Sequence, residues 1–595
     1  MREWSLFPAG AIVLVTLAVL GPGRALAGPS EDLAKLCEEY WEGHLRAHPT
    51  SATAIGDRRY DDRLDDNSPA GRTREQQRLE SMRKRVTAID TRTLAAADRV
   101  NRDALIEDVE GQLAQLSCEF SEWVVDPLDG PQVSFLNLAD YTVIATPKDA
   151  ANYVSRCRAM GRYVDQHVAN LAIGLGKGKI ASLEAVRKTI DQLRVLEGKP
   201  VEEWAMLGPL AADRPTWSEA QRKTFARDLN AAAREHVLPA FARYRSFLES
   251  KILPRARGPE QAGLKALPDG LECYRKMIRV HTSLDMSPDE LHRLGLEQVA
   301  KFRSDLSELG GRALGTSDVA EIQKKLRSNP AMHFKTAEEI EGKAREALGR
   351  AEVAMAGWFG VLPKAKCEVK VMGIHEAPYS TIAYYRNPAK DGSRPGQYMI
   401  NTYKPETRPR YEAEALAFHE AIPGHHLQIA IAQELTGLPE FRKYQGVTAY
   451  FEGWALYTER LADEMKLYST DLDRIGMLSF DAWRACRLVV DTGLHAMGWS
   501  RQQAIDYMVE NSVLADNNVV NEVDRYLTWP AQALAYKVGQ LEILRLREDA
   551  RRKLGARFDI KAFHDVVLRN GAVALPVLRG QVEAWVAAQS PDVPR

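Results

Sequence analysis

The sequence predicts a mainly α-helical protein with one small β-sheet. Apolar and charged residues alternate at three- and four-residue spacing through residues 31–125 and 148–250, which is the periodicity of amphipathic helices. The same pattern resumes at about Tyr411 and continues nearly to the C-terminus. Between them, residues 366–404 place β-branched and aromatic residues around a turn-rich centre. We therefore expect a small sheet with a long loop in that segment.

Composition excludes several classes of function. The 595 residues are 45% hydrophobic and 27% charged, which is ordinary for a soluble globular protein. The formal net charge of -1 supplies no basic surface for nucleic acid, so no nucleic-acid partner is expected. The six cysteines form no Cys-x-x-Cys pair, which argues against a cysteine zinc site. Their disulfide pairing cannot be chosen from the sequence.

The first 27 residues are typical of a secretory signal peptide. Arg2 precedes an uncharged stretch over residues 8–20, and a small-x-small cleavage site ends at Ala27. The uncharged stretch is short for a membrane span, although an uncleaved anchor is an alternative. We expect an exported protein, periplasmic or secreted, with no stable membrane insertion after the signal has been cleaved.

A proline- and glycine-rich segment, Leu253–Asp269, predicts a boundary between two lobes. On this division, residues 28–265 form an N-terminal helical lobe. Residues 266–595 form a second lobe, which contains the clusters described next.

Residues 419–426 read His-Glu-Ala-Ile-Pro-Gly-His-His and predict a metal site. Zinc hydrolases often use His-Glu-x-x-His on a helix, where a spacing of four puts both imidazoles on one face and the glutamate acts as general base. Here the second histidine follows six or seven residues after His419, a rise of roughly 9 to 10.5 Å along a continuous helix. Two imidazoles that far apart could not bind one ion.

Pro423 and Gly424 can interrupt that helix, because proline lacks an N–H group and glycine adopts conformations that other residues resist. A bulge could then bring either His425 or His426 back beside His419, and the residues alone leave both open. The alternative is a Pro-Gly turn between two helices that carry surface histidines.

A third metal ligand is expected on another helix. Residues 446–458 contain a single charged residue, Glu452, among aromatic and small residues. A lone carboxylate there is either a metal ligand or the partner of a buried arginine such as Arg487, because an unpaired buried charge is costly. Zinc is the expected cofactor, although two histidines and a glutamate also accept iron, cobalt or manganese.

A second cluster consists of Arg487, Asp491 and His495, at spacings of four on one helix face. It could be a surface ladder of ion pairs. In the functional interpretation, His495 donates to the oxyanion of a hydrolytic intermediate and Asp491 fixes its tautomer. Arg487 would then bind a substrate carboxylate.

Five further residues complete the predicted site. Tyr526 and Tyr536 are candidate oxyanion donors, although each could belong to the core, and Arg525 is a second candidate for binding a carboxylate. The strand expected at residues 397–403 could pair with an extended substrate through an exposed edge. Tyr398 and Asn401 are therefore candidate substrate-binding residues.

These segments resemble the bacterial domain-of-unknown-function 885 family. The similar blocks are HEAIPGHHLQ, YFEGWALY, RLVVDTGLHAMGW, RYLTWPAQALAYKVG, DGSRPGQYMINT and CYRKMIRVHTSLDMSPDELHRLG. That family is similar to the carboxypeptidase Taq, thimet oligopeptidase and angiotensin-converting enzyme groups, which are mainly helical zinc peptidases with a deep cleft between two lobes. The resemblance implies a two-lobed, zinc-peptidase-like body with the small sheet beside the active-site helix.

The resemblance also implies roles for individual residues. Glu420 would be the general base, and the zinc ligands would be His419, one of His425 and His426, and Glu452. Gly-His-x-Leu in those groups corresponds to residues 424–427, which favours His425. Ala531 departs from the family, where we expect glycine, and this puts the local geometry in doubt.

We therefore expect zinc-dependent hydrolysis of peptide bonds in short peptides, of carboxypeptidase or dipeptidyl-carboxypeptidase type. One alternative is a non-enzymatic, exported helical protein that binds a ligand or captures metal. Glu420 argues against it, because metal storage needs no general base. Another alternative is a zinc hydrolase of a non-peptide amide or ester.

Overall fold

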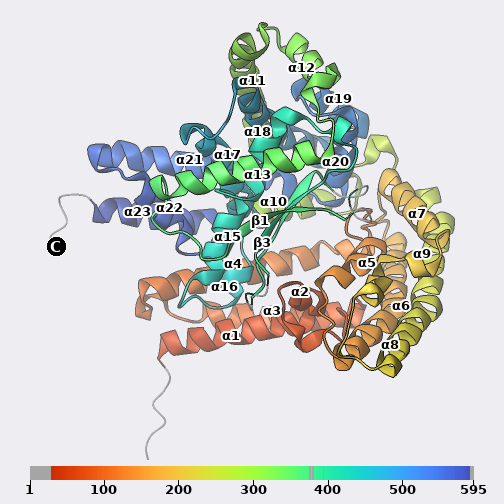
Figure 1. The fold of residues 1–595 in the computed structure, drawn as a ribbon. Helices are drawn as coiled ribbons and strands as arrows, with labels where there is room; N and C mark the ends of the chain where they lie inside the picture. The colour runs from red at the N-terminus through yellow and green to blue at the C-terminus, as the bar shows by residue number, and fades with distance from the viewer. Residues whose placement is uncertain (1–27, 374–376, 378–380, 391, 393, 590–595) are drawn as a thin grey trace, which may run out of the picture.

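The computed structural model describes residues 28–373, 377, 381–390, 392 and 394–589. It confirms a mainly helical chain with one small sheet of three strands (Figure 1). The predicted signal peptide, residues 1–27, lies outside the described residues. Within the described part of the chain, no helix is long and apolar enough to cross a membrane.

The first four helices share a core of their own, which includes Tyr40, Leu79 and Leu105. They are α1 (Pro29–Ala47), α2 (Pro49–Ala54), α3 (Pro69–Thr87) and α4 (Ala96–Ser117). Phe441, from much later in the chain, also belongs to this core. The N-terminal helices are thereby fastened to the part of the molecule that contains the histidine cluster.

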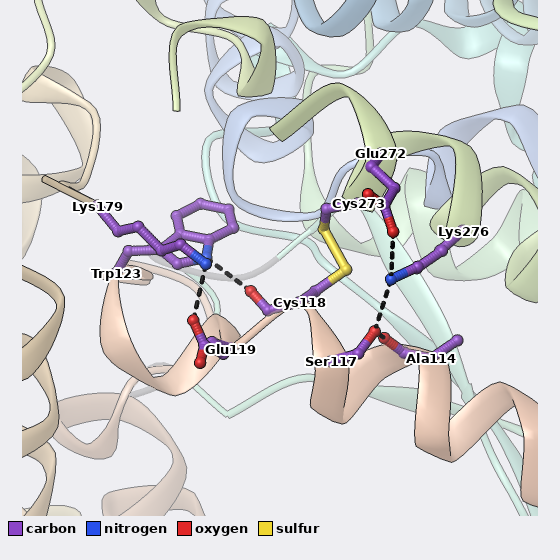
Figure 2. Close-up of a disulfide and its surroundings, with 9 residues drawn as sticks. All are labelled: Ala114, Ser117, Cys118, Glu119, Trp123, Lys179, Glu272, Cys273 and Lys276. Carbon is purple, nitrogen blue, oxygen red and sulfur yellow. Dashed lines mark hydrogen bonds and ion pairs between the residues drawn. A yellow bond between two sulfur atoms is a disulfide. The ribbon is translucent and has the colours of Figure 1, made fainter. Parts of the chain in front are cut away.

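The next helices form a separate body with a second core, from Val125 to Ile252. They are α5 (Pro131–Tyr141), α6 (Pro147–Gly176), α7 (Leu183–Glu197), α8 (Glu219–Ala232) and α9 (Leu238–Phe247), at the lower right of Figure 1. The chain enters this body after Cys118 and returns before Cys273, and a disulfide joins these two cysteines (Figure 2). We call residues 119–272 the 119–272 body. Its neck is the pair of segments 118–123 and 262–274, which flank the disulfide and belong to the largest core. The other cysteines are buried free thiols, at positions 37, 157, 367 and 486.

The remaining helices surround the largest core, which also takes in neck residues on the N-terminal side of the predicted boundary at residue 265. They are α10 (Gly270–Thr282), α11 (Pro288–Leu314), α12 (Val319–Ser328), α13 (Ala337–Ala354), α14 (Ala413–Glu420), α15 (His425–Glu434), α16 (Phe441–Tyr444), α17 (Thr448–Glu464), α18 (Asp471–Thr492), α19 (Arg501–Asn511), α20 (Asp516–Thr528), α21 (Ala535–Leu554), α22 (Ile560–Leu568) and α23 (Leu575–Ala588). Helix α17 packs closely on α21, because a Cβ atom on Gly453 would lie 2.4 Å from Cα of Gly539. The two glycines let the backbones meet beside Glu452.

The sheet contains β1 (Cys367–Val371), β2 (Ala383–Arg386) and β3 (Gly396–Ile400) in the order β1-β3-β2. Strand β3 pairs in parallel with β1 and antiparallel with β2. The prediction that residues 397–403 present a free edge is therefore wrong, since both edges of β3 are occupied. All five residues of β3 are buried, as expected for a central strand.

The two residues of this segment that were predicted to bind substrate are occupied by contacts within the protein or are buried. Asn401 donates its amide to the carbonyl groups of Ala377 and Thr381 and accepts the N–H group of Tyr403. Tyr398 is 1% exposed. We therefore assign neither side chain to substrate binding.

Candidate metal centre

The histidine cluster lies at a sharp break between two helices. Helix α14 ends at Glu420, Ala421 leaves the helical conformation with ψ of -107°, and α15 begins at His425. At Gly424 a Cβ atom would lie 1.9 Å from the carbonyl oxygen of His419, so only glycine fits there. The break folds α15 back, and His425 lies beside His419 with ring centroids 4.9 Å apart.

Helix α17 holds this break from the other side. The indole Nε1 of Trp454 donates to the carbonyl oxygen of Pro423 at 3.0 Å. Thr458, one turn further on, donates to the carbonyl oxygen of Phe418 at 3.3 Å. The helix that contains Glu452 is therefore bonded directly to the segment that contains both histidines.

The structure brings His419, His425 and Glu452 together. One candidate ligand atom from each lies within 4.8 Å of the others, and no other such group is found among the residues that the structure describes. Oε2 of Glu452 is 3.7 Å from Nε2 of His419 and 3.4 Å from Nε2 of His425. Tetrahedral zinc with bonds of about 2.1 Å requires ligand atoms about 3.4 Å apart.

Two of these three residues each leave one buried polar atom without a hydrogen bond. These atoms are Oε2 of Glu452 and Nδ1 of His425. Buried polar groups normally have partners, because leaving one unsatisfied costs about 1–3 kcal/mol. The donor set and the unbonded oxygen that faces two imidazoles both fit a bound zinc ion.

Glu459, which we did not predict from the sequence, orients His419. Its Oε1 accepts from Nδ1 of His419 at 2.7 Å, and the carboxylate is 1% exposed. This bond turns Nε2 of His419 toward Glu452. Glu459 follows Glu452 by seven residues, two helical turns, so the shared helix face was a signal that could have revealed it.

The local electrostatics favour positive charge where these ligand atoms meet. Burial lowers the pKa of His419, but the carboxylates of Glu452 and Glu459 outweigh burial and raise it to about 9. Burial raises the pKa of Glu452, but His419 and His425 hold it well below its usual range. These carboxylates therefore need a cation beside them, which protonated imidazoles or a metal ion can supply.

Glu420, the predicted base, lies at the C-terminal end of α14, next in sequence to His419. Its side chain is half-buried, so water can reach it. Its charge acts on His419 and, after burial, helps raise the pKa of the Tyr398 hydroxyl well above its usual range.

His426, the alternative second ligand, lies elsewhere. Its Nε2 lies 3.1 Å from the carbonyl oxygen of Ala365, to which it donates, and its Nδ1 accepts from the hydroxyl of Tyr385 at 2.8 Å. Burial lowers the pKa of His426 to about 4. Both nitrogens are used to join α15 to Tyr385 of β2 and to Ala365, just before β1, and of the two histidines only His425 faces Glu452.

The predicted oxyanion role of His495 is wrong in this structure. Its Nδ1 accepts from the backbone N–H of Leu264 at 3.0 Å, and its Nε2–H donates to the carbonyl oxygen of Tyr526 at 3.0 Å. The side chain is 0% exposed, and burial lowers its pKa to about 3. Asp491 does not fix the tautomer of His495, because it accepts from Tyr274 and Ala531 instead.

Arg487 is not free to bind a carboxylate, although it was predicted to do so. Its guanidinium pairs with Glu522 at 2.9 Å and donates from Nε to the hydroxyl of Tyr526 at 3.0 Å. It lies between the rings of Trp483 and Tyr536, 4.4 and 4.3 Å from their centroids. Its acidic partner is Glu522, so it does not neutralise Glu452 either.

Of the two predicted tyrosines, Tyr536 lies nearer the metal centre. Its ring is nearly parallel to that of His419, with centroids 6.4 Å apart and an interplanar angle of 13°. Tyr526 is a core residue whose hydroxyl accepts from Trp483 at 3.2 Å. Arg525 donates to Gln532 at 2.7 Å and forms a longer ion pair with Glu522, at 3.5 Å. Its side chain is 16% exposed, whereas that of Arg487 is 1% exposed.

Comparisons with known proteins place the chain in a family of bacterial proteins. The sequence model of the family described as "Bacterial protein of unknown function (DUF885)" matches residues 49–582. A Colwellia psychrerythraea protein, provisionally assigned as a lipoprotein, is 28% identical and superposes with a TM-score of 0.89 over 94% of this chain and 100% of its own. A search of curated proteins found no match.

Two further solved structures are more distant. A Shewanella oneidensis protein, provisionally assigned as a lipoprotein of unknown function, is 17% identical with a TM-score of 0.70, over 92% of this chain and 99% of its own. This likeness shows a common fold. A protein from Bacillus anthracis, provisionally assigned as oligoendopeptidase F, is 11% identical and covers 86% of this chain and 96% of its own, but its TM-score of 0.26 supports no argument.

Proposed function

We propose that this protein uses zinc to hydrolyse peptide bonds in short peptides. The chain belongs to the DUF885 family of bacterial proteins of unknown function, and a fold alone does not assign an activity, so the proposal rests on the site. One observation carries the proposal. His419, His425 and Glu452 converge, with an unbonded carboxylate oxygen, and the partly buried Glu420 is next in sequence to His419. A storage site would need the first three residues but not the fourth.

The chain's own residues have separate tasks in this reaction. Zinc held by such ligands polarises a carbonyl group and lowers the pKa of water. Glu420 accepts the proton from the attacking water and passes it to the leaving amine. Glu459 keeps the proton of His419 on Nδ1. Tyr536 is the predicted oxyanion donor that we retain, because its ring lies beside His419.

The first experiment measures zinc in the purified protein and cleavage of a short-peptide library with and without chelator. We expect about one zinc per chain, which a set of three ligands holds, and cleavage that the chelator abolishes. Glu420→Gln should retain zinc and lose cleavage. Glu583→Gln, at an exposed glutamate on α23, is the matched control and should behave like the wild type.

The alternatives give different results in the same experiment. A metal-capture protein would bind zinc but cleave nothing, and Glu420→Gln would behave like the wild type. A hydrolase of a non-peptide amide or ester would retain zinc and spare every peptide while cleaving model esters in a chelator-sensitive way. Retained peptide cleavage by His419→Ala would overturn the zinc mechanism itself.

We further propose that Arg525 makes the enzyme a carboxypeptidase or dipeptidyl-carboxypeptidase. Glu522 pairs with Arg525 at 3.5 Å and with Arg487 at 2.9 Å, so Arg525 is the more loosely held and the more exposed of the two. Burial lowers the pKa of Arg525, but Glu522 and Tyr536 outweigh burial and raise it above its usual range, and the ring of Tyr536 lies beside His419. Wild-type protein should prefer peptides with a free C-terminal carboxylate to the same peptides as amides. Arg525→Gln should remove that preference by raising KM for the free acids. Equal cleavage of acids and amides by the wild type would remove the end-specific part of the proposal.

We also propose that the protein is exported from the cytoplasm. The composition of residues 1–27 favours it. The provisional assignment of two similar solved structures as lipoproteins points the same way.

A further inference from the structure

The cluster that was predicted to be catalytic forms a buried polar joint between two parts of the molecule. Asp491 and His495 are both 0% exposed, and their partners come from distant segments of the chain. On one side these partners belong to the neck of the 119–272 body. On the other side the partners are Tyr526, near the end of α20, and Ala531, in the connection between α20 and α21. Both nitrogens of His495 and Oδ1 of Asp491 are bonded, and Oδ2 of Asp491 is not. Because buried polar groups weaken a core unless they are bonded, these bonds favour one arrangement of the elements that they connect.

On the neck side, the returning chain lies in close contact with the π-helical turn and is hydrogen-bonded to His495 and Asp491. At Gly263 a Cβ atom would lie 1.8 Å from the carbonyl oxygen of Leu494, so the returning chain passes directly over the π-helical turn. The next residue, Leu264, donates its N–H to His495. Tyr274, which follows the disulfide-bonded Cys273, donates its hydroxyl to Asp491 at 2.6 Å. Figure 2 shows the disulfide that clamps this neck.

The other side leads to the metal centre. Nε2 of His495 donates to the carbonyl oxygen of Tyr526, and the N–H of Ala531 donates to Asp491 at 3.1 Å. These two bonds hold the segment on either side of residues 527–530. Arg525 lies just before that segment, and Tyr536, with its ring beside His419, just after it.

The 119–272 body also contacts this segment directly, at two other points. Asp126 accepts the indole N–H of Trp529 at 2.7 Å. Lys188 of α7 forms an ion pair with Asp524 at 2.7 Å. The segment from residue 524 to 531 is therefore attached to the 119–272 body in two ways. His495 and Asp491 link it to the neck, and Asp126 and Lys188 contact it directly.

We propose that His495 and Asp491 are positioning residues that tie the disulfide-clamped neck of the 119–272 body to residues 524–536. They thereby set the position of Tyr536, whose ring lies beside His419, and of Arg525. This inference rests on the proposed function for its kinetic consequence. Its structural consequence, coupling between the neck and residues 524–536, is independent of any activity.

Two substitutions of His495 separate the two sides of the joint. The amide nitrogen of His495→Gln reproduces Nε2–H, so this variant keeps the bond to Tyr526 and loses the one to Leu264. The amide oxygen of His495→Asn reproduces the acceptor Nδ1, so this variant keeps Leu264 and loses Tyr526. His564 is the matched control, because it is also 0% exposed and bonds through both nitrogens, to Tyr457 and to the carbonyl of Trp358.

Hydrogen–deuterium exchange of residues 519–536 is the primary readout, with zinc content and KM against kcat as the others. Both His495 variants should keep their zinc and exchange faster in residues 524–536. Their kcat/KM should fall by about 10- to 100-fold, the size expected for a displacement near 1 Å. His564→Gln and His564→Asn should leave exchange in that segment unchanged.

Trp529→Phe, which removes only the bond to Asp126, provides a second measurement if the His495 variants do not fold. It should raise exchange over residues 524–531 by a smaller factor. Wild-type exchange in residues 524–536 for either His495 variant would overturn the inference. Exchange raised equally throughout the chain would also overturn it, since that indicates a general loss of stability. If the wild type cleaves no peptide, the proposed function fails, but the exchange comparison still decides the inference.

Discussion

Two clusters of histidine and acidic residues lie in neighbouring parts of the largest core, and their ring nitrogens are used differently. In the first cluster, His419 and His425 each direct a ring nitrogen at Oε2 of Glu452, and this buried oxygen has no hydrogen bond. In the other, His495 bonds through both nitrogens to backbone groups. A buried carboxylate oxygen without a hydrogen bond that faces two imidazole nitrogens indicates a missing ligand. Oδ2 of Asp491 also lacks a hydrogen bond, but both nitrogens of His495 are bonded to backbone groups, which indicates a structural connection.

The comparison also holds within one sequence motif. His425 and His426 are adjacent, yet one faces Glu452 and the other joins α15 to the sheet. Consecutive residues of a helix point about 100° apart, so only one of the two can face a given point.

The largest expected effect separates these two histidines. His425→Ala should lose bound zinc and all chelator-sensitive cleavage, because it removes one of three ligands. His426→Ala should retain zinc and lose only stability, since it removes bonds to Ala365 and Tyr385. Zinc content by atomic absorption and turnover of the best library peptide measure both. The reverse pattern would show that His426 is the ligand.

A second effect tests whether burial in the joint raises the pKa of Asp491. Burial raises the pKa of Asp491 to about 7, although bonds from Tyr274 and Ala531 oppose this. A carboxyl whose pKa is raised on folding contributes stability that is present below the unfolded pKa of about 3.9 and is lost as pH rises through the folded pKa. Asp491→Asn mimics the protonated acid and does not titrate. Relative to the wild type, it should therefore gain stability between about pH 4 and pH 7, by up to about 4 kcal/mol, and gain no more above that.

Melting temperatures of the variant and the wild type at pH 4.5, 7 and 8.5 measure this difference. All other titrating groups are shared, so they cancel in the comparison. A difference that does not change with pH would mean that Asp491 is ionised in the folded protein, as in an ordinary ion pair.

A third effect concerns the orientation of a ligand. Glu459→Gln keeps the size of the side chain but weakens its bond to Nδ1 of His419. Loss of such a partner typically costs about 10- to 100-fold in metal affinity or activity, so we expect zinc affinity to fall by that factor. Competition with a fluorescent chelator measures it, with Glu583→Gln as the control. Unchanged zinc affinity would show that His419 does not depend on Glu459.

Much of the fold followed from residue patterns, because periodicity reports local conformation. The three-and-four spacing identified helices, and the β-branched residues at 366–404 identified a sheet that has three strands. The strand order did not follow, since β3 takes its central place through pairing with β1 and β2, far apart along the chain. Spacing rules describe one element at a time and carry no such information.

The same limit explains the outcome at the candidate site. The Pro-Gly break at residues 423–424 was visible in the sequence because it breaks a local rule. The role of His495 was not, because it depends on Leu264 and Tyr526, which reach it from elsewhere in the chain. Spacing of four along one helix predicted a contact with Asp491, but it carries no information about backbone groups that other segments bring to the same place.

The smallest expected effect lies at Ala531, where the sequence departs from the expected glycine. Ala531 has a φ of 67°, in the left-handed region that costs an L-residue about 1–2 kcal/mol. Ala531→Gly removes that strain but also removes a buried methyl group, worth about 0.8 kcal/mol, and adds unfolded-state entropy of about 0.4–1 kcal/mol. These terms nearly cancel, so the melting temperature should change little, and KM should not change because the N–H bond to Asp491 is kept. Ala531→Val, with a β-branched side chain in the same conformation, should destabilise the protein clearly. A large loss in the glycine variant would mean that the methyl group, and not the backbone bond, holds this side of the joint.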